Sequence, residues 1–185
     1  MAGTTLFRKL TAADAPLLAR HLLRLEPEDW RARFHGHVAR DLATEHARRL
    51  DWARVVVIGG FCDGELRAVG ELHPTTDGGA CDAEIAVTVE TGWQNRGIGT
   101  ELLRRLINAA RNRGLRRVCL LCLADNARIR HLVEKLEGSL HGDLGQMEGS
   151  IAPLPATFAT LLEEGLEDGE ALLARLRELS RRRAA

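Results

Sequence analysis

The chain has 185 residues, of which 45% are hydrophobic and 28% charged, and its formal net charge is zero. This length predicts one domain with a sizeable core, and the composition excludes an intrinsically disordered chain. The lack of a basic excess argues against a nucleic-acid-binding protein, and no apolar run reaches the ~18 residues of a membrane span.

The first third of the chain predicts a strand and two helices. The strand covers residues 4–10, and a capping-box pattern at residues 11–14 introduces the first helix. Residues 26–29 end that helix, residues 30–38 are ambiguous, and residues 41–50 predict the second helix. The core-facing residues expected from the helical spacing of the first helix are Leu17, Leu18, His21, Leu22 and Leu25.

The middle of the chain predicts three strands and a strongly amphipathic helix. Residues 54–61 and 65–73 read as strands joined by a tight Asp63-Gly64 hairpin, and residues 82–90 form a third strand. A turn-like segment leads into a helix over residues 100–113, which Gly114 ends.

The last third predicts a strand over residues 117–124, a helix over 126–136 and one or two weak strands within 139–152. Two prolines follow, and residues 157–183 then predict a long, Leu-rich and charged helix. The whole order predicts an α/β protein with a central mixed sheet flanked by helices. We expect one domain over residues 1–152 and a helical extension over residues 153–185.

Four cysteines are too few for a disulfide scaffold in a chain of this length. Cys119 and Cys122 match a CxxC pattern, but on a strand this spacing sends the two side chains to opposite faces. We therefore expect buried, unreactive cysteines, a similarly inert Cys81, and no metal site. His35 and His37 also lack further ligands at metal-binding spacing. The N-terminus has no secretory signal, which favours a cytoplasmic location.

The informative motif is Gln94-Asn-Arg-Gly97-Ile-Gly99, which lies between a predicted strand and the amphipathic helix. Glycines let backbone N–H groups approach an anion closely, and the helix that follows presents unpaired N–H groups and a positive dipole end. Arg96 can add a charged contact. The motif is neither a dinucleotide fingerprint nor a P-loop. It predicts a cradle for a pyrophosphate.

In this context the sequence resembles the GNAT superfamily of acetyl-CoA-dependent N-acetyltransferases. Gln94 to Gly99 agrees with the coenzyme loop Q/R-x-x-G-x-G/A of that family, and the resemblance covers residues 4–152. It is most similar to the GNAT domain of bacterial Pat-type protein lysine acetyltransferases. The supporting residues are Ala83-Glu84-Ile85-Ala86-Val87, Trp93-Gln94, Asn126, and Leu25-x-Pro27-Glu28 with Arg33-Phe34.

The resemblance implies that acetyl-CoA lies where two central strands splay apart. No metal is implied. Backbone groups on the preceding strand would pair with the pantetheine arm, the loop amides would hold the pyrophosphate, and Asn126 would lie near the thioester. The implied coenzyme-binding residues are Val87, Thr88, Val89, Gln94, Asn95, Arg96, Gly97, Ile98, Gly99, Thr100 and Asn126.

The same resemblance makes Glu84 the candidate general base. A lysine amine is almost fully protonated at neutral pH, so direct attack on the thioester needs a group that removes the proton. Glu71 and His73, at the end of the preceding strand, are candidate acceptor contacts. Many family members protonate the leaving thiolate with a Tyr seven residues after the asparagine, but this chain has Val133 there and contains no Tyr.

Three functions remain open from the sequence. The first is acetylation of a protein lysine, and the second is acetylation of a small amine such as an antibiotic or a polyamine. The third is a non-catalytic module that binds acyl-CoA, which the missing Tyr would fit. We expect a monomer or a homodimer, with no nucleic-acid or membrane partner.

Overall fold

The computed structural model describes residues 4–34, 41–75, 80–123, 127–135, 138–143 and 146–183. This part of the chain contains a seven-stranded sheet with the order β1-β2-β3-β4-β5-β7-β6. The strands are β1 (Leu6–Lys9), β2 (Val56–Cys62), β3 (Glu65–Pro74), β4 (Ala83–Val89), β5 (Val118–Leu123), β6 (Ser139–Asp143) and β7 (Gln146–Ile151). Every pair of neighbours is antiparallel except β4 and β5, which run parallel. The expected mixed sheet is confirmed.

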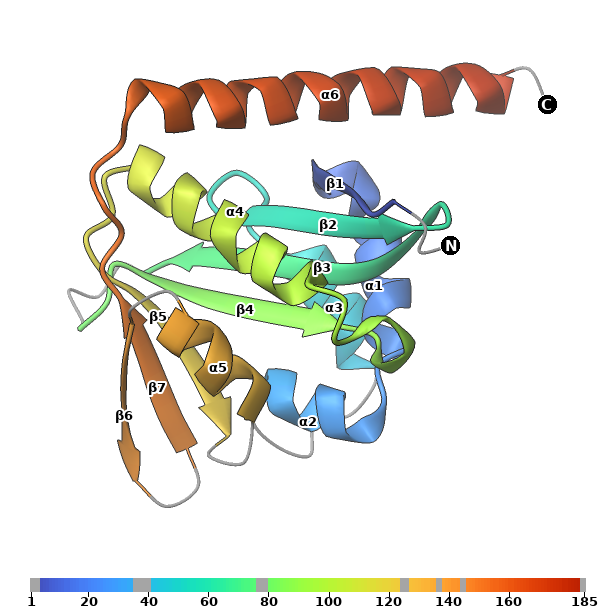
Figure 1. The fold of residues 1–185 in the computed structure, drawn as a ribbon. Helices are drawn as coiled ribbons and strands as arrows, with labels where there is room; N and C mark the ends of the chain where they lie inside the picture. Colours follow the sequence, from blue (N-terminus) through green and yellow to red (C-terminus); the bar gives the residue numbers. More distant parts are fainter. Residues whose placement is uncertain are drawn as a thin grey trace.

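The helices cover both faces of this sheet (Figure 1). They are α1 (Ala15–Leu23), α2 (Pro27–Phe34), α3 (Leu42–Arg49), α4 (Ile98–Asn112), α5 (Ala127–Lys135) and α6 (Phe158–Arg183). The ambiguous residues 30–38 thus begin within a helix that starts at Pro27, a residue suited to the first helical turn. The helix predicted from residue 100 begins two residues earlier, at Ile98.

Two apolar clusters lie on opposite faces of the sheet. The first contains Leu102, Leu103 and Leu106 of α4, each with no exposed surface, packed on alternate residues of β2 to β5. The second packs α1, α2 and α3 on the other face through residues such as Leu18, Leu22 and Trp30. This division places even-numbered β4 side chains toward α1–α3 and odd-numbered ones toward α4.

The Asp63-Gly64 hairpin is confirmed. Cys62 pairs with Glu65, and both turn residues have positive φ, 51° at Asp63 and 81° at Gly64. This is the backbone geometry that an Asp-Gly pair adopts at little cost in a two-residue hairpin. Gly114 has φ of 69° just past the end of α4, as its sequence position predicts.

The long last helix, α6, crosses α4 and β1 at one edge of the molecule (Figure 1). None of the helices in the described residues is both long enough and apolar enough to cross a membrane.

Candidate functional site

The site is built on an unequal pairing of β4. On one side, β4 pairs with β3 over all of its residues, from Ala83 to Val89. On the other side, it pairs with β5 at Ala83 and Glu84 only, after which the two parallel strands diverge. Beyond the Ile85 amide, the edge of β4 is therefore unpaired within the described residues, and it can accept an extended ligand as if it were another strand.

The hydrogen-bond register tells which residues face this open edge. The Glu90 amide donates to the Arg67 carbonyl of the β3 side, at 3.0 Å. Because strand backbones alternate, even-numbered residues of β4 direct their amides and carbonyls to β3, and Val87 and Val89 direct theirs to the gap. The backbone groups of Thr88 are among those directed to β3.

A short loop carries the chain from the open edge to the N-terminus of α4. Gly97 precedes the helix with φ of 79°, a left-handed conformation that suits glycine, and a Cβ there would meet no atom within 4 Å. No side chain caps this helix, and the first helical bond to the loop is donated by Glu101 to the Gly97 carbonyl, at 3.0 Å. The amides of Ile98, Gly99 and Thr100 therefore have no intrahelical acceptor and are available to an anion.

The side chains of this loop are used to hold its shape. The Gln94 amide donates to the Val89 carbonyl at 2.9 Å and to a carboxylate oxygen of Asp29 on α2 at 3.0 Å. Thr91 donates to the same Asp29 oxygen. Arg96 donates to the Gly92 carbonyl and lies over the Trp93 ring, 4.7 Å from its centroid. The side chains of Gln94 and Arg96 thus both contact protein groups that stabilise the loop.

Glu84 lies at the last paired position before the gap. It is directly opposite His73 of β3 on one side and Cys119 of β5 on the other. Its side chain is half-buried on the face covered by α1–α3. Within the described residues its carboxylate has no hydrogen-bond or ion-pair partner.

Glu71, in contrast, is completely engaged. Its carboxylate is buried and accepts bonds from Arg33 of α2 at 3.0 Å, from His46 of α3 at 3.0 Å and from His73 at 2.8 Å. Burial raises the pKa of Glu71, but Arg33 and the two imidazoles outweigh it and hold the pKa well below its usual range. Glu71 is therefore a permanent anion that fixes His73 beside Glu84.

A second buried cluster holds the far end of β4. His21 of α1 has no exposed surface, and its Nδ1 and Nε2 lie 3.1 Å from Glu90 and 2.9 Å from Thr88. Burial lowers the pKa of His21, so its neutral ring donates to Glu90 and accepts from the Thr88 hydroxyl. Thr88 is only 7% exposed, and its hydroxyl lies within this cluster.

Glu90 also accepts from Arg24 at 3.0 Å and from Arg67 at 2.8 Å. Burial raises its pKa, but the bonds from His21, Arg24 and Arg67 outweigh burial and bring the pKa down to about 2. No sequence spacing predicts this cluster, because its members lie on or directly beside α1, β3 and β4 and meet only in the folded chain.

The cysteine prediction is wrong for two of the four residues. Cys81 and Cys119 form a disulfide with a Cα–Cα distance of 5.9 Å, joining the segment before β4 to β5 beside Glu84. A carboxylate oxygen of Glu148 lies 3.2 Å from the Cys119 sulfur. The three side chains are close enough to share a metal ion, but the disulfide uses both sulfurs. Cys62 is buried and free, as expected.

Several predicted positions lie outside the described residues, namely Asn126 and the histidines 35 and 37. The structure adds three residues that the sequence analysis missed: Asp29, Arg33 and His46. All three lie on α2 or α3, where neither spacing nor composition reveals which strand residue they will meet. The Arg33-Phe34 match was the one sequence signal close to them.

The gap between the parallel strands β4 and β5 leads to a helix N-terminus that no side chain caps. This arrangement suits an elongated ligand with a phosphate group at one end. Residues 19–138 match the model of the acetyltransferase (GNAT) family, which is more than half of the chain. The chain therefore belongs to the acetyltransferase (GNAT) family.

Solved structures agree on the fold. The GNAT domain of S. lividans PAT is similar with a TM-score of 0.67 and 22% identity, over 79% of this chain and 89% of that one. A putative acetyltransferase from Salmonella typhimurium, yncA, with its cofactor acetyl-CoA, has a TM-score of 0.63 and 17% identity, over 83% and 96%. A ribosomal-protein-alanine N-acetyltransferase from Brucella melitensis has a TM-score of 0.63 and 18% identity, over 80% and 99%.

Proposed function

We propose that this protein is an acetyl-CoA-dependent N-acetyltransferase that transfers the acetyl group directly to the amine of a protein lysine. The observation that carries the proposal is the course of β4: one strand presents the Glu84 carboxylate, which has no partner among the described residues, then an unpaired edge, and then leads to the uncapped N-terminus of α4. These features follow the order of amine, pantetheine and pyrophosphate along the reacting complex.

In this proposal the coenzyme extends the sheet. Amide and carbonyl groups of the pantetheine arm pair with the open edge at Val87 and Val89, and the pyrophosphate accepts bonds from Ile98, Gly99 and Thr100. Asn95 and Arg96, both exposed, flank the pyrophosphate. The similar Salmonella protein was solved with acetyl-CoA, and a similar N-acetyltransferase from Thermoplasma acidophilum with coenzyme A. The side chain of Asn126 is proposed to lie near the thioester, on the strength of the family resemblance.

Glu84 acts as the general base. The incoming amine must lose a proton before or during attack on the thioester carbonyl, and a carboxylate without another partner can accept it directly or through a water molecule. The tetrahedral intermediate then collapses and releases the coenzyme thiolate. Because the chain contains no Tyr, a water molecule supplies the proton to that thiolate, and a backbone N–H can stabilise its charge by a hydrogen bond.

The charges around Glu84 favour a single-amine acceptor over a polyamine. A polyamine or aminoglycoside site needs several free anions, and Glu71 and Asp82 were the candidates beside Glu84. Glu71 is neutralised by Arg33, His46 and His73. Asp82 accepts the backbone amides of Arg116 and Arg117, which lower its pKa. Of these three carboxylates, only Glu84 has no partner within the described residues, which suits binding of one lysine side chain.

The test is release of free thiol from acetyl-CoA with three acceptor sets: mixed lysine peptides, the same peptides with acetylated lysines, and a panel of polyamines and aminoglycosides. We expect release that depends on free lysine. Turnover confined to small amines would reject the protein substrate, and tight acetyl-CoA binding without turnover by any acceptor would reject the enzyme.

A further inference from the structure

The helix α6 has its apolar side turned to solvent. Seven large apolar side chains on it are each more than half exposed, from 51% to 82%: Phe158, Leu161, Leu162, Leu166, Leu172, Leu173 and Leu176. With 3.6 residues per helical turn, these seven positions lie along one side of the helix. We call these seven residues, with Gly165 and Gly169 between them, the leucine face. A solvated stripe of this length is unusual for a monomer and marks an interaction surface.

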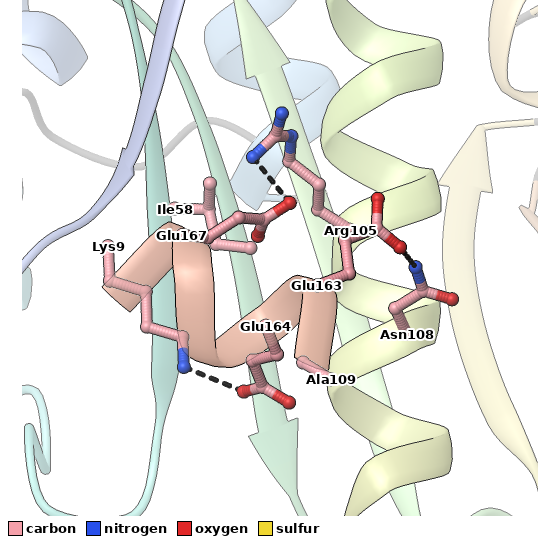
Figure 2. A pocket seen from close by; sticks show the side chains of 8 residues that line it. All are labelled: Lys9, Ile58, Arg105, Asn108, Ala109, Glu163, Glu164 and Glu167. Atoms are coloured by element: carbon pink, nitrogen blue, oxygen red, sulfur yellow. Dashed lines mark hydrogen bonds and ion pairs between the residues drawn. The ribbon is translucent and has the colours of Figure 1, made fainter. Parts of the chain in front are cut away.

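The opposite side of α6 is polar, and it is this side that contacts the domain (Figure 2). Lys9 pairs with Glu164 at 2.6 Å, and Arg105 of α4 pairs with Glu167 at 2.8 Å. Figure 2 shows these pairs and the bond from Asn108 to Glu163 around a small cavity between α4 and α6. The polar contacts fix the orientation of the helix, so the leucine face cannot turn inward without breaking them.

The leucine face is self-complementary when two copies run in opposite directions. A two-fold axis at Gly169 places Leu162 opposite Leu176, seven residues to either side, and Leu166 opposite Leu172, three to either side. The same axis places Leu173 opposite Gly165. Gly165 and Gly169 both face open space, because a Cβ at either position would meet no atom within 4 Å. Since neither has a side chain, a second helix can approach the backbone closely there. A surface that meets itself about a two-fold axis is what a homodimer requires.

The apolar area of the leucine face is also large enough for a dimer interface. Covering seven such side chains removes on the order of 500 Å² of apolar surface from each copy, or about 1,000 Å² from the pair, near the lower bound for a specific interface. We infer that the leucine face binds the leucine face of a second copy of this chain, with the two α6 helices antiparallel. The interface lies on α6, away from the open edge of β4, so each copy keeps its own acyl-transfer site.

The first experiment is sedimentation equilibrium of the full chain between about 1 and 100 µM. We expect the wild type to form a dimer of the 20.4 kDa chain, and the double variant Leu166→Glu with Leu172→Glu to be monomeric, with its dissociation constant raised at least 100-fold. Leu42→Glu is the matched control, because Leu42 is another exposed leucine at 40%, at the start of α3. It should remain dimeric.

The second experiment does not depend on disrupting the helix. Gly169→Cys should form a disulfide-linked dimer under mild oxidation, because the axis brings the two residues together, whereas Glu170→Cys on the neighbouring side should not. Circular dichroism checks that every variant keeps its helix. A monomeric wild type at 100 µM would overturn the proposal, as would a dimer that survives the Leu166/Leu172 double variant. Equal cross-linking at residues 169 and 170 would also overturn it.

Discussion

The two edges of β4 differ in how far they are paired, and the difference separates structure from function along a single strand. The β3 edge is paired from end to end and reinforced by side-chain clusters around Glu71 and Glu90. The β5 edge is paired only at Ala83 and Glu84. A rigid strand can leave one edge unpaired because the other edge holds it in place, and the unpaired edge is then ready for a ligand without a change of fold.

The largest expected effect is on catalytic activity, at the β5 edge of β4. Replacing Glu84 with Gln keeps the shape of the side chain but removes its ability to accept a proton, so we expect kcat to fall about 10²- to 10⁴-fold. Binding of acetyl-CoA, measured by calorimetry, should change little. Glu65→Gln, on the exposed end of β3, is the control and should keep full activity. Wild-type turnover by the Glu84 variant would remove Glu84 from the mechanism.

At the paired edge, Glu90 should affect stability rather than chemistry. Its pKa falls from 4.5 to about 2 on folding, so it contributes about 3 kcal/mol that is present in full above pH 4.5 and is lost as the pH falls through 2. Urea unfolding should therefore show a large loss of stability for Glu90→Gln at pH 7 and a smaller one at pH 3. A difference that does not change with pH would contradict this assignment. Glu28→Gln, at an exposed position of α2, should match the wild type at both pH values.

The loop before α4 gives a smaller effect. Gly97→Ala places a Cβ on a residue with φ of 79°, at a cost of about 1–2 kcal/mol, and should raise the KM for acetyl-CoA about 10-fold. Gly92→Ala is matched to it, since Gly92 lies in the same loop and its φ is not in the left-handed region. If both variants have the same KM, the loop conformation does not control coenzyme binding.

The smallest effect compares neighbouring residues of β4 directly. On addition of acetyl-CoA, the amides of Val87 and Val89 should exchange their hydrogens several-fold more slowly, since these face the gap. Ala86 and Thr88 should change little, because their amides are already directed to β3. Amide exchange measured by NMR resolves the four residues. Uniform slowing along β4 would indicate general stiffening instead of pairing at one edge.

Local patterns determined much of the fold in advance. The order of strands and helices, the Asp63-Gly64 turn and the stop at Gly114 follow from short-range chemistry, because each depends on residues next to one another. The motif from Gln94 to Gly99 located the helix N-terminus for the same reason. Its side chains were less predictable: Gln94 and Arg96 bond to protein groups, since Asp29 and the Trp93 ring come within reach only in the folded chain.

The residues that the sequence missed share one property. Arg33 and His46 reach Glu71 from two different helices, and Cys81 reaches Cys119 across two strands. Each pairing joins segments that are distant along the chain, and no spacing rule connects them. The sequence predicts the strand that carries Thr88 but not its register, and the register decides which edge of the strand each backbone group faces.

The helices α4 and α6 show most clearly what the sequence alone does not determine. Both sequences predict a helix with one apolar side, and both form one. The α4 side is buried against the sheet, with Leu106 fully covered, whereas the α6 side faces solvent, with Leu166 63% exposed. Periodicity determines that an apolar side exists. Which side of a helix faces the domain depends on the groups that the domain presents. For α6, Lys9, Arg104 and Arg105 of the domain form ion pairs with the polar side.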